Sequence, residues 1–183
     1  DHYIYLSTPE VTPFQVTVTL GNGVPLAGSP FTLSQSNPVR ITIGNSQPSI
    51  MFLEQNNVNT VQSDKGLILQ ASKDFYVSFR VQSQNQAEIL VPKGRTALGT
   101  SFRVGSLPQL YDSAIRNFVT SFMATEDNTT VNVSDYGSGV TFITPSGTTT
   151  VTSQTFTLNK GQSVVLSGYT DVIANRNGFI GAL

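Results

Sequence analysis

The residues best suited to bind a metal ion lie together in one short acidic segment, Glu126-Asp127-Asn128. Calcium prefers oxygen ligands of this kind, and it usually takes roughly six to eight of them. The regular Asp-x-Asp-x-Asp-Gly spacing is absent, however, and Asp and Asn side chains also commonly bond to the backbone of a turn. The sequence therefore favours a hairpin turn at these residues, with a calcium site as the weaker alternative.

Residues for nucleophilic catalysis are scarce. His2 is the only histidine, cysteine is absent, and no Ser-x-x-Lys sequence occurs. A Ser-His-Asp triad needs a histidine as its base, and a multi-histidine zinc site needs several. The 11 acidic residues leave a glycan-active hydrolase formally open, although they are scattered over turns. We therefore predict that the protein is not an enzyme and has no cofactor.

Three tyrosines lie in polar, turn-like contexts: Tyr111, Tyr136 and Tyr169. Exposed aromatic side chains there would stack on sugars or anchor a protein partner. The alternative is that they cover the ends of a β-sandwich. Near the first of them, Asp112-Ser113-Ala114 resembles a short O-glycosylation signal of exported bacterial proteins, so Ser113 is a candidate modification site.

The composition predicts a β-rich extracellular protein. Only 11% of residues are charged, whereas about 25% is typical. Ser, Thr, Asn and Gln make up 67 of the 183 residues, and Thr favours strands while Ser and Asn favour turns. The net charge of −1, with scattered Lys and Arg, gives no basic face for nucleic acid. No run approaches the roughly 20 apolar residues of a membrane span.

Alternating apolar and polar residues recur along the chain and predict strands with one buried face. Phe14 to Leu20 and Phe75 to Val81 are examples, and turn residues follow at short intervals. No stretch of ten residues shows a helical period. The predicted fold class is therefore all-β, with antiparallel strands in sandwich-type units and no helix longer than a turn or two.

A weak internal repeat indicates two related units. Val16-Thr17-Val18-Thr19 resembles Val131-Asn132-Val133-Ser134, and Phe31-Thr32-Leu33 resembles Phe156-Thr157-Leu158. An apolar Val39/Ile41 pair likewise matches Val164/Leu166, and Lys65-Gly66-Leu67-Ile68 matches Asn177-Gly178-Phe179-Ile180. A strand follows this last match in the first unit only. We therefore expect the second unit to be truncated, with an open C-terminal edge at which another chain can donate a strand.

Four segments in this order resemble the N-terminal domain of the IgG Fc-binding protein family. They are Lys65-Gly66-Leu67-Ile68, Val91-Pro92 through Ala97-Leu98-Gly99-Thr100, Thr125-Glu126-Asp127-Asn128-Thr129-Thr130, and Leu158-Asn159-Lys160-Gly161-Gln162. The resemblance covers roughly residues 60 to 183. It implies an extracellular binding role, without catalytic residues, and the family includes bacterial surface proteins, some from gliding bacteria.

The domain organisation expected from the resemblance is a first β-unit beginning in residues 1–60 and a family-like region at 61–183, with one continuous domain as the alternative. The predicted function is an extracellular binding or adhesion module of a larger bacterial surface protein. Its partner would be a protein or glycan at a cell surface. A structural spacer, or an assembly subunit completed by a strand from another chain, is the second hypothesis.

Overall fold

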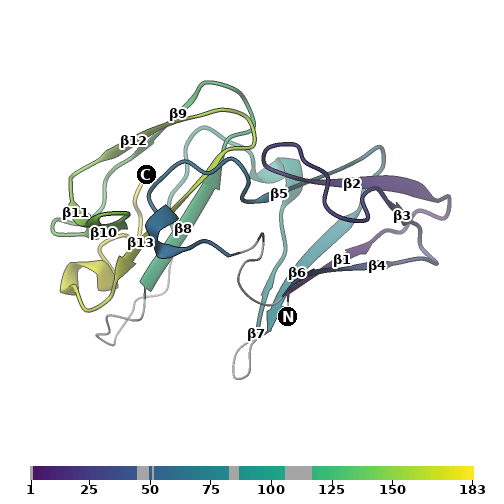
Figure 1. Cartoon of the computed structure of the whole chain (residues 1–183), viewed down its shortest axis with the longest axis horizontal. Helices are drawn as coiled ribbons and strands as arrows, with labels where there is room; N and C mark the ends of the chain where they lie inside the picture. The colour runs from purple at the N-terminus through teal and green to yellow at the C-terminus, as the bar shows by residue number, and fades with distance from the viewer. Residues whose placement is uncertain (1, 45–49, 51, 83–86, 106–116) are drawn as a thin grey trace. The chain divides into compact units, whose positions relative to one another are not determined.

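The computed structural model describes residues 2–44, 50, 52–82, 87–105 and 117–183. Strands dominate these residues, and the helices are single 3₁₀ turns of three or four residues. The all-β antiparallel class is therefore confirmed. The chain divides into two compact units (Figure 1): unit 1 comprises Asp1–Phe52 and Asp64–Leu98, and unit 2 comprises Leu53–Ser63 and Gly99–Leu183. The predicted domain division after residue 60 stays a prediction.

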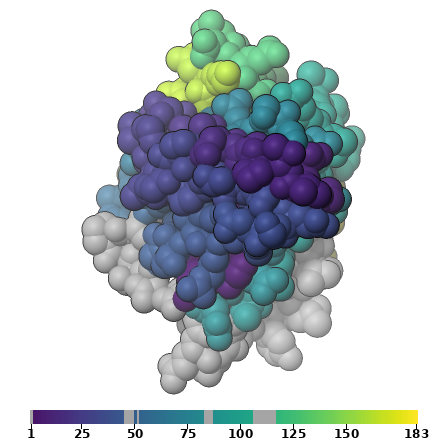
Figure 2. Space-filling model, turned by 90° about the vertical axis from the view of Figure 1, so that its right-hand side faces the viewer, coloured from purple at the N-terminus to yellow at the C-terminus, as the bar shows by residue number. Residues whose placement is uncertain are grey.

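Unit 1 is a β-sandwich of two sheets. One sheet has four strands in the order β4 (Val39–Gly44), β1 (His2–Ser7), β6 (Tyr76–Gln82) and β7 (Ala87–Leu90). The other has three, in the order β3 (Phe31–Leu33), β2 (Phe14–Leu20) and β5 (Leu67–Ala71). Alternate side chains of the two sheets meet in one core: Ile4, Leu6, Phe14, Val16, Val18, Leu33 and Ile41. Residues of these N-terminal strands, in purple, also reach the surface in Figure 2.

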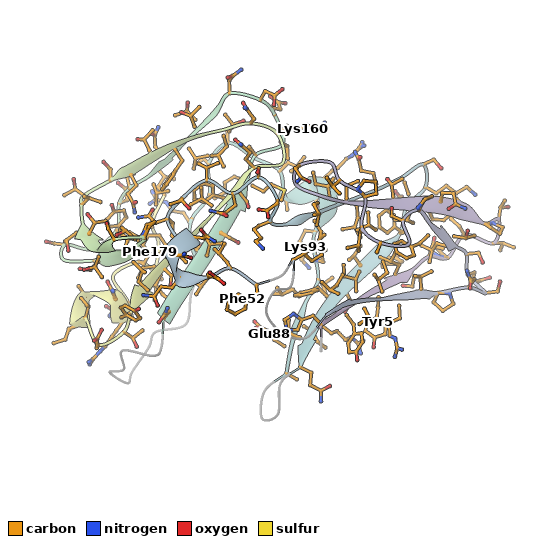
Figure 3. All side chains as sticks on the ribbon, viewed as in Figure 1. Tyr5, Phe52, Glu88, Lys93, Lys160 and Phe179 are labelled. Atoms are coloured by element: carbon orange, nitrogen blue, oxygen red, sulfur yellow. The ribbon has the colours of Figure 1, made fainter. Side chains whose placement is uncertain are left out.

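Unit 2 is built from three strand pairs. They are β8 (Asn117–Met123) with β13 (Ser163–Tyr169), β9 (Thr129–Val133) with β12 (Gln154–Leu158), and β10 (Thr141–Thr144) with β11 (Gly147–Thr150). Its core combines strand residues with an aromatic cluster in which the rings of Phe118 and Phe179 stack at 4.8 Å. Phe179 lies among the side chains of this unit in Figure 3. The described residues also contain three 3₁₀ turns: η1 (Gln55–Asn57) and η3 (Ile173–Arg176) in unit 2, and η2 (Gly94–Ala97) in unit 1.

The internal repeat corresponds to a shared strand arrangement with the same register. In unit 1, β1 pairs with β4 and β2 pairs with β3; in unit 2, β8 pairs with β13 and β9 with β12. Val16 lies opposite Phe31 in the first unit, and the matching Val131 lies opposite Phe156 in the second. Because register sets which face every side chain occupies, the repeat holds for the buried face as well as for the strand order.

The last match of the repeat, Lys65-Gly66-Leu67-Ile68 with Asn177-Gly178-Phe179-Ile180, is wrong. The structural counterpart of Ile68 is Leu183, three residues beyond Ile180. In unit 1, Ile68 of β5 pairs with Thr19 of β2. In unit 2, the counterpart of Thr19 is Ser134, and it exchanges two backbone hydrogen bonds of 2.9 Å with Leu183, not with Ile180. The glycines that suggested the match differ in role. Gly66 takes a positive φ of 84° at the start of β5, whereas a Cβ on Gly178 would overlap the Ala174 carbonyl.

Candidate functional site

The acidic segment forms the turn between β8 and β9, and it is bonded to the turn between β12 and β13. The Asp127 carboxylate accepts the backbone N–H of Lys160 at 3.0 Å. In the other direction, the Asn159 amide oxygen accepts the N–H of Asn128 at 3.1 Å. Asn128 adopts a positive φ of 56°, a conformation that Asn tolerates better than most residues. The two turns are therefore joined by reciprocal side-chain to backbone bonds.

This connection gives the Thr-Glu-Asp-Asn-Thr-Thr and Leu-Asn-Lys-Gly-Gln segments a structural role. Backbone bonds reinforce it, since Gly161 N–H donates to the Ala124 carbonyl at 2.8 Å and Ala124 N–H donates to the Gln162 carbonyl at 3.0 Å. Among the residues that the structure describes, no group of three His, Asp or Glu side chains could hold a metal ion. One Asp127 oxygen already accepts a backbone bond, and calcium at Glu126, Asp127 and Asn128 stays a prediction.

Tyr136 packs against the core of unit 2. Its ring is 5.1 Å from that of Phe142 and 5.7 Å from that of Phe179. Burial raises the pKa of the Tyr136 hydroxyl above its usual value, because the ionised form loses hydration. The hydroxyl oxygen is buried and has no hydrogen-bond partner among the described residues. Its contacts are thus those of a structural residue, as in the alternative of a tyrosine that covers the sandwich.

Tyr169 lies at the end of β13 and is half-buried. Its hydroxyl accepts a 2.6 Å hydrogen bond from the Gln55 side-chain amide of η1, and its carbonyl accepts one of 2.8 Å from the Asn175 side chain. Tyr111 and Ser113 lie outside the described residues. Tyr136 and Tyr169 thus make different contacts within unit 2, and a binding role for the three tyrosines stays a prediction.

Asn175 is the buried polar residue that organises this end of unit 2. Its side-chain amide donates to the carbonyls of Thr141 and Tyr169 at 2.9 and 2.8 Å, and its oxygen accepts the Thr141 N–H at 2.8 Å. A neighbouring pocket lined by Val104, Phe118, Asn175 and Phe179 among others has a volume of about 10 Å³. Such a space is roughly the size that one water molecule needs.

An exposed apolar segment of unit 1 was not recognised from the sequence as a candidate site. It comprises β7 and the residues up to Leu98, and all of these residues are exposed. Ile89, Leu90, Val91 and Leu98 are each between 54 and 58% exposed. Among the strands that the structure describes, β7 is also the edge strand of its sheet, next to β6. The signal in the sequence is the consecutive Ile89-Leu90-Val91 run, which places apolar side chains on both faces of the strand.

Two compact units built from antiparallel strands define an all-β protein. A family model described as IgGFc binding protein matches residues 86–182, which is more than half of the chain. The chain therefore belongs to the IgGFc binding protein family. No curated protein and no solved structure matches it.

Membership of this family indicates an extracellular, protein-binding module. The resemblance identified from the sequence is confirmed, although the match begins at residue 86, so that the Lys65 to Ile68 segment lies outside it. It includes the exposed apolar segment and most of unit 2. In the described part of the chain, no helix has the length and apolar character needed to cross a membrane.

Proposed function

We propose that this protein is a non-catalytic adhesion module of a larger bacterial surface protein, and that it binds an extended segment of a partner protein along β7. The family supports protein binding, and the low charge and lack of cysteine support a bacterial exoprotein. The proposal depends on one observation above all, which is the exposed apolar edge of the four-stranded sheet in unit 1.

A sheet edge presents backbone N–H and C=O groups that can pair with an added strand. Natural proteins usually protect such an edge with lysines, prolines or a covering loop. β7 has the sequence Ala-Glu-Ile-Leu, and the protective Pro92 and Lys93 come only after Val91. An incoming strand would gain main-chain hydrogen bonds from this edge, and the apolar side chains would provide the contact area.

A library of random peptides displayed on phage tests the proposal, with IgG Fc as a protein probe in parallel. We expect enriched peptides with alternating apolar residues, and hydrogen exchange that slows at β7 when they bind. A Leu90→Lys/Val91→Lys variant should lose this binding, whereas a matched Val11→Lys variant, on an exposed residue before β2, should keep it. Equal binding to both variants, or no enrichment, would refute the role of β7.

The second candidate is an assembly or spacer subunit in which another chain donates a strand to β9. In unit 1, β5 pairs along β2 from Leu20 to Val16. In unit 2, the pair Ser134 with Leu183 occupies the register of the Thr19–Ile68 pair, and β12 is the strand that pairs with β9 in the described residues. Val16 is fully buried, whereas the matching Val131 is only half-buried.

A synthetic peptide that copies residues 66–72, flanked by lysines for solubility, tests this candidate. It carries the strand that completes unit 1, so it should slow hydrogen exchange in β9 and leave exchange in β2 unchanged. A peptide with Pro in place of Leu69 removes one backbone donor and should fail to do so. Unchanged exchange in β9 with both peptides would eliminate strand donation at this edge.

A further inference from the structure

The outer face of the four-stranded sheet in unit 1 carries tyrosine and arginine side chains. Because side chains alternate along a strand, Tyr3 and Tyr5, which alternate with the buried Ile4 and Leu6, project to the other face. The strand register places these outward residues side by side across β4, β1 and β6: Tyr3, Tyr5, Arg40, Thr42, Tyr76, Ser78 and Arg80. In Figure 3, Tyr5 projects from β1 on the side away from β2.

The two arginines stack on the two tyrosines of the central strand. The Arg40 guanidinium carbon lies 5.2 Å from the centre of the Tyr3 ring, and that of Arg80 lies 4.6 Å from the centre of the Tyr5 ring. Stacking holds the flat face of each guanidinium against a ring, and the N–H groups of a stacked guanidinium can still bind a carboxylate through two hydrogen bonds. In Arg80 the Nε–H also donates to the Ser78 hydroxyl, at 3.5 Å. The arginines are thus held in place before any partner arrives.

The charge of this face is positive. Neither Arg40 nor Arg80 forms an ion pair within the described residues, in which the ion pairs are Lys73–Glu10 and Arg103–Asp135. Glu88 is the only acidic residue in the four strands, and its register opposite Val81 places it on the inner side of the sheet. Tyr76, the first residue of β6, is 69% exposed and adds an exposed aromatic ring.

We propose that this Tyr/Arg face, formed by Tyr3, Tyr5, Arg40, Tyr76 and Arg80, binds an acidic segment of a protein partner. The proposal rests on the proposed protein-binding function, but the face lies outside residues 86–182 and is separate from the β7 edge. Tyrosine and arginine are the residue types enriched at the centres of protein interfaces. The spacing of strands and residues puts the Cα atoms of the two arginines about 10–12 Å apart, so the face suits a segment with more than one carboxylate.

A titration of the isotope-labelled protein with a ten-residue glutamate peptide tests the proposal by nuclear magnetic resonance. We expect the side-chain Nε–Hε signals of Arg40 and Arg80, and the amide signals of β1 and β6, to shift in a saturable way at low salt. A ten-residue glutamine peptide, which has no charge, should cause no shift. Raising the salt to physiological strength should weaken binding several-fold, because these charges are exposed.

Substitutions at single arginines distinguish this face from a general charge effect. Arg40→Gln and Arg80→Gln should each lower the affinity for the glutamate peptide by about two- to fivefold, the range for exposed ion pairs. Arg95→Gln, on the exposed η2 turn, is the matched control and should leave binding unchanged. Amide spectra of the free variants report whether unit 1 keeps its fold.

Three results would overturn the proposal. They are the absence of shifts on this face, shifts that persist in the Arg40→Gln/Arg80→Gln variant, and saturable binding of a sulfated hexasaccharide where the glutamate peptide has no effect. The last would assign the face to an anionic glycan instead. The β7 experiments give a separate answer, since an uncharged Leu90→Ser/Val91→Ser variant should leave the glutamate titration unchanged.

Discussion

Replacing Asn175 by alanine tests whether one buried amide holds together the end of unit 2. Asn175 is only 2% exposed, and its side chain forms three hydrogen bonds of 2.8 to 2.9 Å with Thr141 and Tyr169. The substitution leaves one backbone N–H and two carbonyls without these partners. Each lost bond typically costs about 1 kcal/mol, so we expect the free energy of unfolding to fall by about 3 kcal/mol.

The assay is urea unfolding followed by tyrosine fluorescence and circular dichroism, since the chain has six tyrosines and no tryptophan. In a thermal scan, the same loss corresponds to a decrease in Tm of roughly 6 to 12 °C for a protein of this size. Hydrogen exchange adds a local measurement, because the Thr141 N–H donates to the Asn175 oxygen and should exchange much faster in the variant.

Asn177→Ala is the matched control, because Asn177 follows η3 and is exposed. We expect it to change the free energy of unfolding by less than about 0.5 kcal/mol, as surface substitutions usually do. The reasoning fails if Asn175→Ala costs no more than Asn177→Ala, or if exchange of the Thr141 amide is the same in both variants.

Three further predictions concern the packing, the joined turns and the pH dependence of unit 2. Gly168→Ala should destabilise it by about 1–3 kcal/mol, because the added methyl group overlaps a carbonyl of β10, whereas Gly105→Ala has open space and should be neutral in the same urea assay. Asp127→Ala should speed exchange of the Lys160 amide and cost about 1 kcal/mol, and calcium should not raise the Tm of the wild type; a calcium-dependent rise would instead support the metal site. Burial raises the pKa of Tyr136 in the folded state. The contribution of this group to the stability of the fold is therefore complete below its unfolded pKa, and it is lost as the pH rises through its folded pKa. Tyr136→Phe should lose one alkaline step of an absorbance titration, with stability unchanged within about 1 kcal/mol, since the buried hydroxyl has no described partner.

The repeat in the sequence identified corresponding strands of the two units, and the structure shows that these strands share their register. Val131 and Phe156 repeat the types of Val16 and Phe31, and both pairs are direct cross-strand neighbours. The alternation of apolar and polar residues along a strand specifies its register, because one face of the sheet is buried.

The strand β1 was not recognised, because its outward residues Tyr3 and Tyr5 are aromatic and hide the alternation with Ile4 and Leu6. The bonds between the Asp127 turn and the Lys160 turn were equally hidden. They depend on β8 pairing with β13 and β9 with β12, which brings two distant turns to the same end of the unit. Tyr136 has polar neighbours in the sequence, and only the tertiary fold places its ring against Phe142.

The position of the segment Leu53–Ser63 in the chain determines the order in which the two units can fold during synthesis. It belongs to unit 2, where Asn59 N–H donates to the Val165 carbonyl and Gln62 pairs with Ser163 of β13, yet it is made between the two parts of unit 1. About a hundred residues must be added after Gln62 before its partner strand exists, which at roughly 5–20 residues per second takes about 5–20 seconds. Unit 1 needs only the chain up to Leu98. We expect unit 1 to fold first on the ribosome, while the Leu53–Ser63 segment waits as an unpaired loop until β13 emerges.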